Sequence, residues 1–147
     1  MCGLAGFLTK TSLKSNSEDL LRKMGRSLVH RGPDDDGVWM DPAAGVGLAH
    51  QRLSVIDLSS EGRQPMISAS GRYVITYNGE IYNFLELRKN LDQTEDSHWR
   101  GHSDTEVILA SIEKWGLPQA LKKFNGMFAF ALWDREMQTL TLARDRI

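Results

Sequence analysis

Apolar residues recur along this chain at two spacings, and these spacings predict strands and helices. Uninterrupted apolar runs, and runs in which apolar and polar residues alternate, indicate strands. The run at residues 127–133 is apolar on both alternating faces, so a strand there must be covered on both sides. The predicted strands lie at residues 2–8, 38–40, 46–53, 72–77, 127–133 and 139–143.

Helical spacing of apolar residues predicts the helices. Ser15 and Glu18 have the spacing of a capping box and are predicted to begin the first helix. Ser103 and Glu106 have the same spacing before a helix that ends at a glycine. Pro118 is expected in the first turn of a short helix, where proline is tolerated. The predicted helices cover residues 15–29, 84–91, 103–116 and 118–124.

Strands that come in hairpins, together with fewer helices and a strand buried on both faces, predict two stacked, largely antiparallel sheets covered by helices. This is an α+β layered sandwich. A length of 147 residues fits one domain, residues 1–147, with a real core. The content of 41% hydrophobic and 25% charged residues is typical of a soluble globular protein.

Charge and cysteine content narrow the function classes. The net charge is −1 and there is no basic stripe, so nucleic acid is not an expected partner. The longest apolar run, 127–133, is far shorter than the roughly 20 residues that cross a bilayer, so no membrane association is expected. One cysteine excludes an intrachain disulfide framework and suits a reducing compartment, so a cytoplasmic location is predicted.

Two groups of residues could suggest a metal, and neither has the right pattern. Asp34, Asp35 and Asp36 are consecutive rather than alternating, which indicates a solvated turn in a polar loop at 30–37 and not a calcium loop. His98 and His102 are four residues apart, but no third ligand has zinc spacing. No metal site is predicted.

Cys2 is the candidate nucleophile. If Met1 is removed, Cys2 carries both a thiol and a free α-amine. An α-amine has a pKa of about 7.7–8.0, so it is partly unprotonated near neutral pH and can act as the base for its own side chain. Cys2 could instead be an ordinary small apolar residue of a buried strand. Position alone leaves both interpretations open.

Asn78 and Gly79 follow a predicted strand. This pair usually marks a tight hairpin turn, but the residues after it have helical spacing. A sharp strand-to-helix turn is therefore predicted at Asn78–Gly79, with the side-chain amide and a backbone N–H directed into a site, as an oxyanion hole requires. Asp104 lies in the first turn of a predicted helix, where a carboxylate also has the structural role of favouring the helix dipole.

Several short motifs occur in order along the chain. They are MCGLAG at residues 1–6, HRGPD at 30–34, HQRLS at 50–54, YNGEIYN at 77–83, SDTE at 103–106 and FNGMFAF at 124–130. Together they resemble the glutaminase domain of class II glutamine amidotransferases. Within this class, the motif sequences most resemble those of the glutamine-hydrolysing asparagine synthetase branch. The resemblance covers essentially the whole chain.

This resemblance implies an N-terminal-nucleophile hydrolase with a four-layer αββα sandwich. It implies that Cys2 attacks the side-chain amide of glutamine, with its α-amine as the general base. Asn78 and Gly79 match the family's oxyanion hole. The residues implied to bind glutamine are Arg52 for the α-carboxylate, Asp104 with Glu80 for the α-ammonium group, and Leu53, Ser54, Val55 and Ile56 for the pocket wall.

The resemblance also implies partners beyond glutamine. Such domains pass ammonia to an ATP-using synthetase domain, which this sequence does not contain, so the chain is expected to be incomplete at its C-terminus. ATP and Mg would belong to that synthetase domain, and no cofactor is expected here. A homodimer is left open. Alternatives are the glutaminase domain of a sugar-related amidotransferase, or an interaction domain in which Cys2 is structural. If Met1 is retained, the base is missing and the chain is expected to be inactive.

Overall fold

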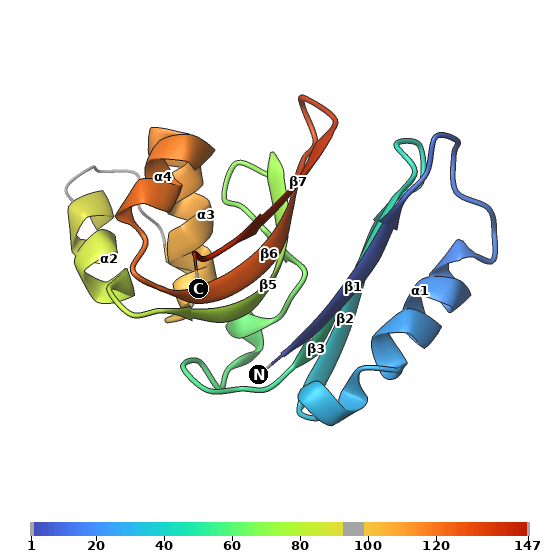
Figure 1. The fold of residues 1–147 in the computed structure, drawn as a ribbon, viewed down its shortest axis with the longest axis horizontal. Coiled ribbons are helices and arrows are strands. Elements are labelled where there is room, and N and C mark those ends of the chain that lie inside the picture. The colour runs from blue at the N-terminus through green and yellow to red at the C-terminus, as the bar shows by residue number, and fades with distance from the viewer. Residues whose placement is uncertain (1, 93–98, 147) are drawn as a thin grey trace.

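The computed structural model describes residues 2–92 and 99–146. Within them, two antiparallel sheets are stacked face to face and helices cover both outer faces, as Figure 1 shows. The first sheet has the order β1-β3-β2 and the second the order β4-β5-β6-β7. The strands are β1 (Gly3–Leu8), β2 (Asp35–Asp41), β3 (Val46–Arg52), β4 (Met66–Ile67), β5 (Tyr73–Ile81), β6 (Gly126–Asp134) and β7 (Thr139–Arg144).

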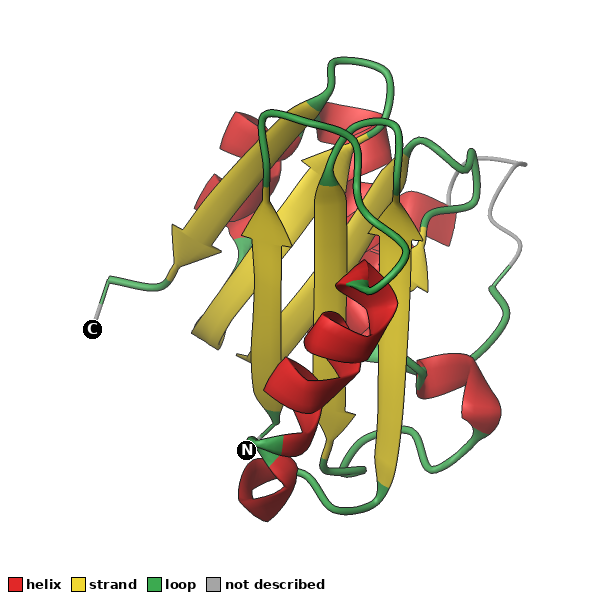
Figure 2. Ribbon diagram, turned by 90° about the vertical axis from the view of Figure 1, so that its right-hand side faces the viewer, coloured by secondary structure: helices red, strands yellow, loops and turns green. Residues whose placement is uncertain are grey.

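The helices divide between the two outer faces. Helix α1 (Ser17–Arg26) lies across the sheet of β1, β2 and β3, with the second sheet behind it, as seen in Figure 2. Helices α2 (Phe84–Asp92), α3 (Asp104–Trp115) and α4 (Leu117–Lys123) cover the second sheet. Short 3₁₀ turns occur at η1 (Val29–Arg31) and η2 (Ser60–Gly62).

Strand β6 shows why this layering is stable. Its residues Phe128, Phe130 and Leu132 pack with the helices, whereas Ala131 and Trp133 pack against the other sheet. Both faces of the strand are therefore buried in apolar contacts, because successive side chains point to opposite faces. The predicted α+β sandwich of helix, sheet, sheet and helix layers is confirmed, as is the two-sided burial of this strand.

The first helix differs from its predicted limits. The predicted capping box at Ser15 and Glu18 is wrong, because Asn16 is the N-cap and makes no side-chain cap hydrogen bond. Ser17 instead accepts a hydrogen bond from the Lys14 N–H at 3.0 Å, a local turn that competes with the cap. Glu18 pairs with Arg22 one turn along the helix at 2.7 Å. The helix ends at residue 26 and not at 29.

Strand β5 also differs from its prediction. The turn predicted at Asn78–Gly79 is wrong, because the strand continues through both residues to Ile81. Asn78 is opposite Ala129 and Gly79 is opposite Phe128, so pairing with β6 continues the strand through both residues. The chain leaves the strand four residues later than expected and then enters α2.

Two further boundaries were predicted incompletely. Strand β2 begins at Asp35, inside the predicted polar loop, because Asp35 pairs with Arg52 of β3. One of the two hydrogen bonds of the predicted capping box at α3 is present, because Ser103 Oγ accepts from the Glu106 N–H at 3.4 Å. The Glu106 carboxylate, however, accepts from the N–H groups of Arg100 and Gly101 and not from that of Ser103.

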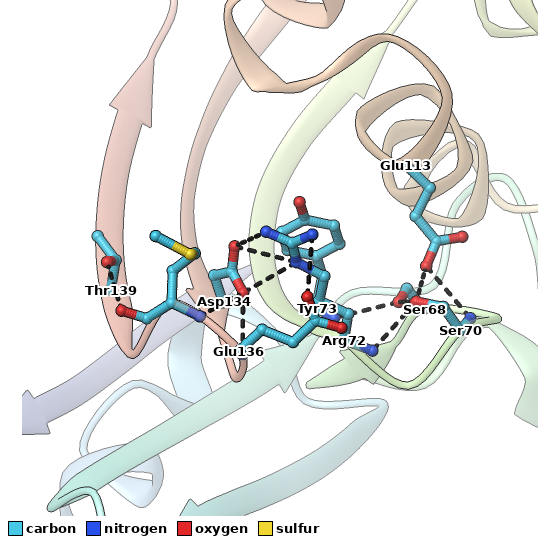
Figure 3. A network of polar contacts seen from close by, with 9 residues as sticks. Ser68, Ser70, Arg72, Tyr73, Glu113, Asp134, Glu136 and Thr139 are labelled. Atoms are coloured by element: carbon cyan, nitrogen blue, oxygen red, sulfur yellow. Dashed lines mark hydrogen bonds and ion pairs between the residues drawn. The ribbon is translucent and has the colours of Figure 1, made fainter.

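A polar network fixes the beginning of β5, as Figure 3 shows. Arg72 donates to Asp134 from Nη2 at 2.7 Å and from Nε at 3.0 and 3.2 Å. This guanidinium is the main reason that the pKa of Asp134 lies below its ordinary value. Ser70 donates to Glu113 of α3 through its N–H at 3.2 Å. These contacts join the second sheet to helix α3 at the Tyr73 end of β5, which is the end away from Asn78.

Candidate active site

A cavity of about 180 Å³ opens where the ends of β3 and β5 meet the start of β1 and of α3. All but one of the predicted site residues line it: Cys2, Arg52, Leu53, Val55, Ile56, Asn78, Gly79, Glu80 and Asp104. Among the described residues that form its wall, Ser54 is missing, and its N–H instead donates to Asp34 at 2.8 Å. The fold thus brings together residues from four separate motifs.

Cys2 stands one residue before β1 and is half-buried. Its sulfur accepts a hydrogen bond from the Leu53 N–H at 3.3 Å and lies 3.6 Å from the Leu53 carbonyl oxygen. The Arg31 guanidinium donates to the Cys2 carbonyl oxygen at 3.1 Å. These contacts fix the residue at both its backbone and its side chain. The predictions about Met1 lie outside the described residues.

Asn78 and Gly79 form the part of the cavity wall that belongs to β5. Asn78 Oδ1 is buried and has no hydrogen-bond partner among the described residues. Gly79 has a φ of 153°, a conformation that other residues rarely adopt. A Cβ at Gly79 would also overlap the backbone of Met127 and Phe128 in β6, so this strand accepts only glycine here.

Arg52 ends β3 and is 7% exposed. One guanidinium nitrogen donates to the Ser59 carbonyl oxygen at 2.9 Å and the other to the Asp57 carbonyl oxygen. The loop at 53–62 therefore wraps around a fixed cation. Burial would raise the pKa of Asp57, but hydrogen bonds from Ser59 and His102 outweigh it and lower the pKa, which keeps Asp57 charged beside Arg52.

Asp104 is the first residue of α3 and is 5% exposed. Its Oδ2 accepts from the Tyr77 hydroxyl at 2.7 Å and from the Ile81 N–H at 2.9 Å. Burial raises the pKa of Asp104 above its ordinary value, and the charge of Glu80 adds to this. Glu80 itself is exposed at the rim of the cavity.

Two residues that support the site, Gln64 and His50, were not predicted from the sequence to belong to it. Gln64 accepts a 2.6 Å hydrogen bond from the Tyr77 N–H and donates to Thr105 at 3.3 Å. His50 lies 3.0 Å from the Tyr77 carbonyl oxygen through Nε2. Burial lowers the pKa of His50 to about 4, so the ring is neutral at pH 7. The only sequence signal was that His50 and Arg52 share one face of a strand.

The described residues, 2–92 and 99–146, contain no cluster of three or more His, Cys, Asp or Glu side chains arranged to hold a metal. His98, which is four residues before His102, is outside them. The helices in the same part of the chain are all too short or too polar to span a membrane.

Comparison with known proteins shows the family of this chain. Residues 1–147 match the family described as a glutamine amidotransferase domain. The chain belongs to that family. This glutamine amidotransferase domain is 40% identical over 147 residues to glutamine-hydrolysing asparagine synthetase 1 of Bacillus subtilis, and the match covers 99% of the chain and 22% of the relative.

Other relatives have different names. A putative glutamine-hydrolysing asparagine synthetase 2 of Methanocaldococcus jannaschii is 35% identical, covering 100% of the chain and 30% of the relative. The amidase chry2 of Gibberella zeae is 36% identical, covering 99% and 23%. The chain therefore spans less than a third of the length of these three curated relatives.

A solved structure supports the fold assignment. The glutamine phosphoribosylpyrophosphate amidotransferase of B. subtilis, complexed with ADP and GMP, superposes with a TM-score of 0.69. It covers 98% of this chain and 36% of the other chain at 20% identity. At that identity the likeness concerns the fold alone.

Proposed function

We propose that this domain hydrolyses the side-chain amide of glutamine to glutamate and ammonia, with Cys2 as the nucleophile. The observation that carries the proposal is the composition of one cavity wall. A thiol, a guanidinium, a buried carboxylate and a side-chain amide come from four segments and face the same space. An amino-acid amide needs a cation for its carboxylate, an anion for its ammonium group, and an oxyanion site next to the nucleophile.

In the proposed reaction the α-amine of Cys2, free after removal of Met1, takes the thiol proton as sulfur attacks the amide carbon of glutamine. The carbonyl oxygen takes up negative charge beside the Asn78 amide and the Gly79 N–H. The protonated amine then gives its proton to the departing nitrogen, the C–N bond breaks, and a γ-glutamyl thioester remains. Water, deprotonated by the same amine, breaks the C–S bond and releases glutamate and the thiol.

The binding roles follow from charge and place. Arg52 pairs with the α-carboxylate of glutamine. It uses the guanidinium N–H groups that do not donate to the loop carbonyl oxygens. Asp104, with Glu80 at the rim, pairs with the α-ammonium group. Leu53, Val55 and Ile56 contact the aliphatic part of the substrate. Ser54 does not line the cavity, and its role is to connect these residues along the chain.

The ammonia is proposed to pass to a synthetase domain. The names of the relatives support this partner, because they are glutamine-hydrolysing synthetases more than three times as long as this chain. ATP and Mg are then needed only in that partner domain, and no cofactor is needed for the thioester chemistry here. The cytoplasmic location and the homodimer stay predictions.

A glutaminase assay tests this proposal. The 147-residue chain with Met1 removed, verified by intact mass, is expected to release glutamate and ammonia in equal amounts from glutamine. A glutamine-analogue electrophile is expected to add one label, at Cys2. The matched control is the chain that keeps Met1, which has an amide in place of the amine and is expected to be inactive. Full activity in the uncleaved chain would refute the terminal-amine mechanism.

Gly62→Ala is expected to raise KM for glutamine by about tenfold, with little change in kcat, because it displaces a charged hydrogen-bonding group. A Cβ at this position would overlap the end of the Arg52 guanidinium, while the φ of Gly62 needs no glycine. Steady-state kinetics measure the effect. Gly25→Ala is the control, since its Cβ would make ordinary contacts at 3.5 Å in α1. An unchanged KM in Gly62→Ala would contradict the carboxylate role of Arg52.

A further inference from the structure

Tyr77 lines the cavity but has no part in the proposed reaction. It comes directly before Asn78 in β5, so its side chain leaves the strand on the opposite face. There it packs among the apolar residues of the helical layer and is only 2% exposed. Its hydroxyl lies 2.7 Å from Oδ2 of Asp104.

We propose that Tyr77 is a positioning residue that holds the Asp104 carboxylate in the orientation that receives the α-ammonium group of glutamine. Through this contact it selects α-amino-acid amides over amides that lack the ammonium group. The inference rests on the proposed function and adds to it a determinant of substrate class.

The geometry supports an oriented carboxylate. The Tyr77 hydroxyl and the Ile81 N–H donate to the same oxygen, Oδ2, at 2.7 and 2.9 Å. Two donors on one oxygen restrict rotation of the carboxylate and leave Oδ1 as the oxygen that a cation in the cavity can reach. Asp104 forms part of the cavity wall, so a ligand there can contact it.

The backbone of Tyr77 is held as firmly as its hydroxyl. Strand β4 pairs only with residues 74 and 75 of β5, so on that side of β5 the N–H and carbonyl groups of Tyr77 meet side chains, while β6 pairs with the strand on its other side. Gln64 accepts from the N–H at 2.6 Å, and His50 lies 3.0 Å from the carbonyl oxygen. Both buried backbone groups are therefore satisfied, and the position of the ring follows from them.

Electrostatics give the hydroxyl a second effect. Burial is the main cause that raises the pKa of Asp104, and the Tyr77 hydrogen bond is the largest effect that lowers it. The N–H groups of Ile81 and Thr105 also lower it, and Glu80 raises it. Burial and the Asp104 charge raise the pKa of Tyr77, so the hydroxyl stays protonated and stays a donor. The titratable groups that share the cavity with Asp104 are Cys2, Arg52, Asp57, Tyr77 and Glu80.

Removing the hydroxyl should therefore weaken the ammonium site in a pH-dependent way. Tyr77→Phe is expected to raise KM for glutamine by about tenfold, with kcat nearly unchanged, since a hydrogen bond to a charged group is lost. In the variant the pKa of Asp104 is higher, so more of the carboxyl is neutral at a given mildly acidic pH. The rise of KM on acidification is expected to begin at a higher pH than in the wild type.

A substrate lacking the ammonium group separates orientation from packing. With glutaric acid monoamide, which is glutamine without its α-amino group, Tyr77→Phe is expected to leave kcat/KM unchanged. The preference for glutamine over the monoamide then falls about tenfold. Tyr73→Phe is the matched control, because the same atom is removed from the same strand at its far end. This control is expected to keep both the preference and the pH profile.

A second variant, Asp104→Asn, tests whether the two residues act together. Asp104→Asn removes the charge, and it should abolish the preference for glutamine. The double variant should then be no worse than Asp104→Asn alone, because the two residues act as one unit. Additive losses would overturn the inference.

The possible failures are distinguishable. A wild-type chain with Met1 removed that releases no glutamate would overturn the proposed function. The inference about Tyr77 would still be tested in the substrate-free chain by a ¹³C NMR titration of the Asp104 carboxyl carbon. An apparent pKa that is higher in Tyr77→Phe than in the wild type is expected. Equal titrations, or an active wild type beside a variant with unchanged KM, would overturn the inference alone.

Discussion

Replacing Cys2 with alanine is expected to abolish glutamine hydrolysis, with a loss in kcat on the order of 10⁴-fold or more, because the loss of a nucleophile disables the whole catalytic unit. Cys2 is the only cysteine of the 147 residues, so no other thiol can replace it. Release of glutamate from saturating glutamine, on chains whose N terminus has been verified by mass, measures the effect.

The fold should survive this change. Within residues 2–92 and 99–146, the Cys2 sulfur has hydrogen-bonding contacts with the Leu53 backbone, at 3.3 and 3.6 Å, and the residue is half-buried. Cys2→Ala is therefore expected to unfold close to the wild-type temperature and still to bind glutamine, which calorimetry can measure. Residual hydrolysis at a few per cent of the wild-type rate or more would contradict the nucleophilic role.

Replacing Asn78 with alanine is expected to lower kcat by about 10²–10³-fold with little change in KM, the usual cost of removing one oxyanion donor. The side chain lines the cavity from β5, and its Oδ1 has no partner among the described residues. Removing the amide therefore breaks no hydrogen bond to that oxygen, so little stability should be lost. Steady-state kinetics on glutamine measure the effect.

Two further variants test whether the loss of kcat is specific to the Asn78 amide. Asn78→Asp keeps the shape but places acceptors where a donor is required, so its loss of kcat should be at least as large. Asn90→Ala, at an exposed position of α2, is the control and should leave kcat unchanged. A normal kcat in both Asn78 variants would exclude this side chain from the oxyanion hole.

Much of this architecture was predictable from local pattern. A run that is apolar on both faces, residues 127–133, required layers on both sides, and the structure supplies helices on one side and a sheet on the other. The helices at 84–92 and 104–115 begin and end close to their predicted positions. These features depend on neighbours three or four residues away, which is the range that periodicity and capping residues report.

Pairing between distant segments was not predictable in the same way. Strand β5 runs through Asn78 and Gly79 because β6, about 50 residues later, pairs with both of them. Local rules favoured a turn there, since this residue pair is common in turns. The free energy of strand pairing comes from the partner strand, and no local pattern states which strand that is.

The chain's motifs indicated which residue types gather at the candidate site, since a nucleophile, a cation, an anion and an amide each belong to a recognisable segment. The supporting contacts were decided only by the tertiary structure. Tyr77 reaches Asp104, and Gln64 and His50 hold the Tyr77 backbone, because β4 stops short of that position and buried peptide groups must find other partners. The Tyr77 peptide groups need these side-chain partners because β4 does not extend beside them, and that need arises only in the folded molecule.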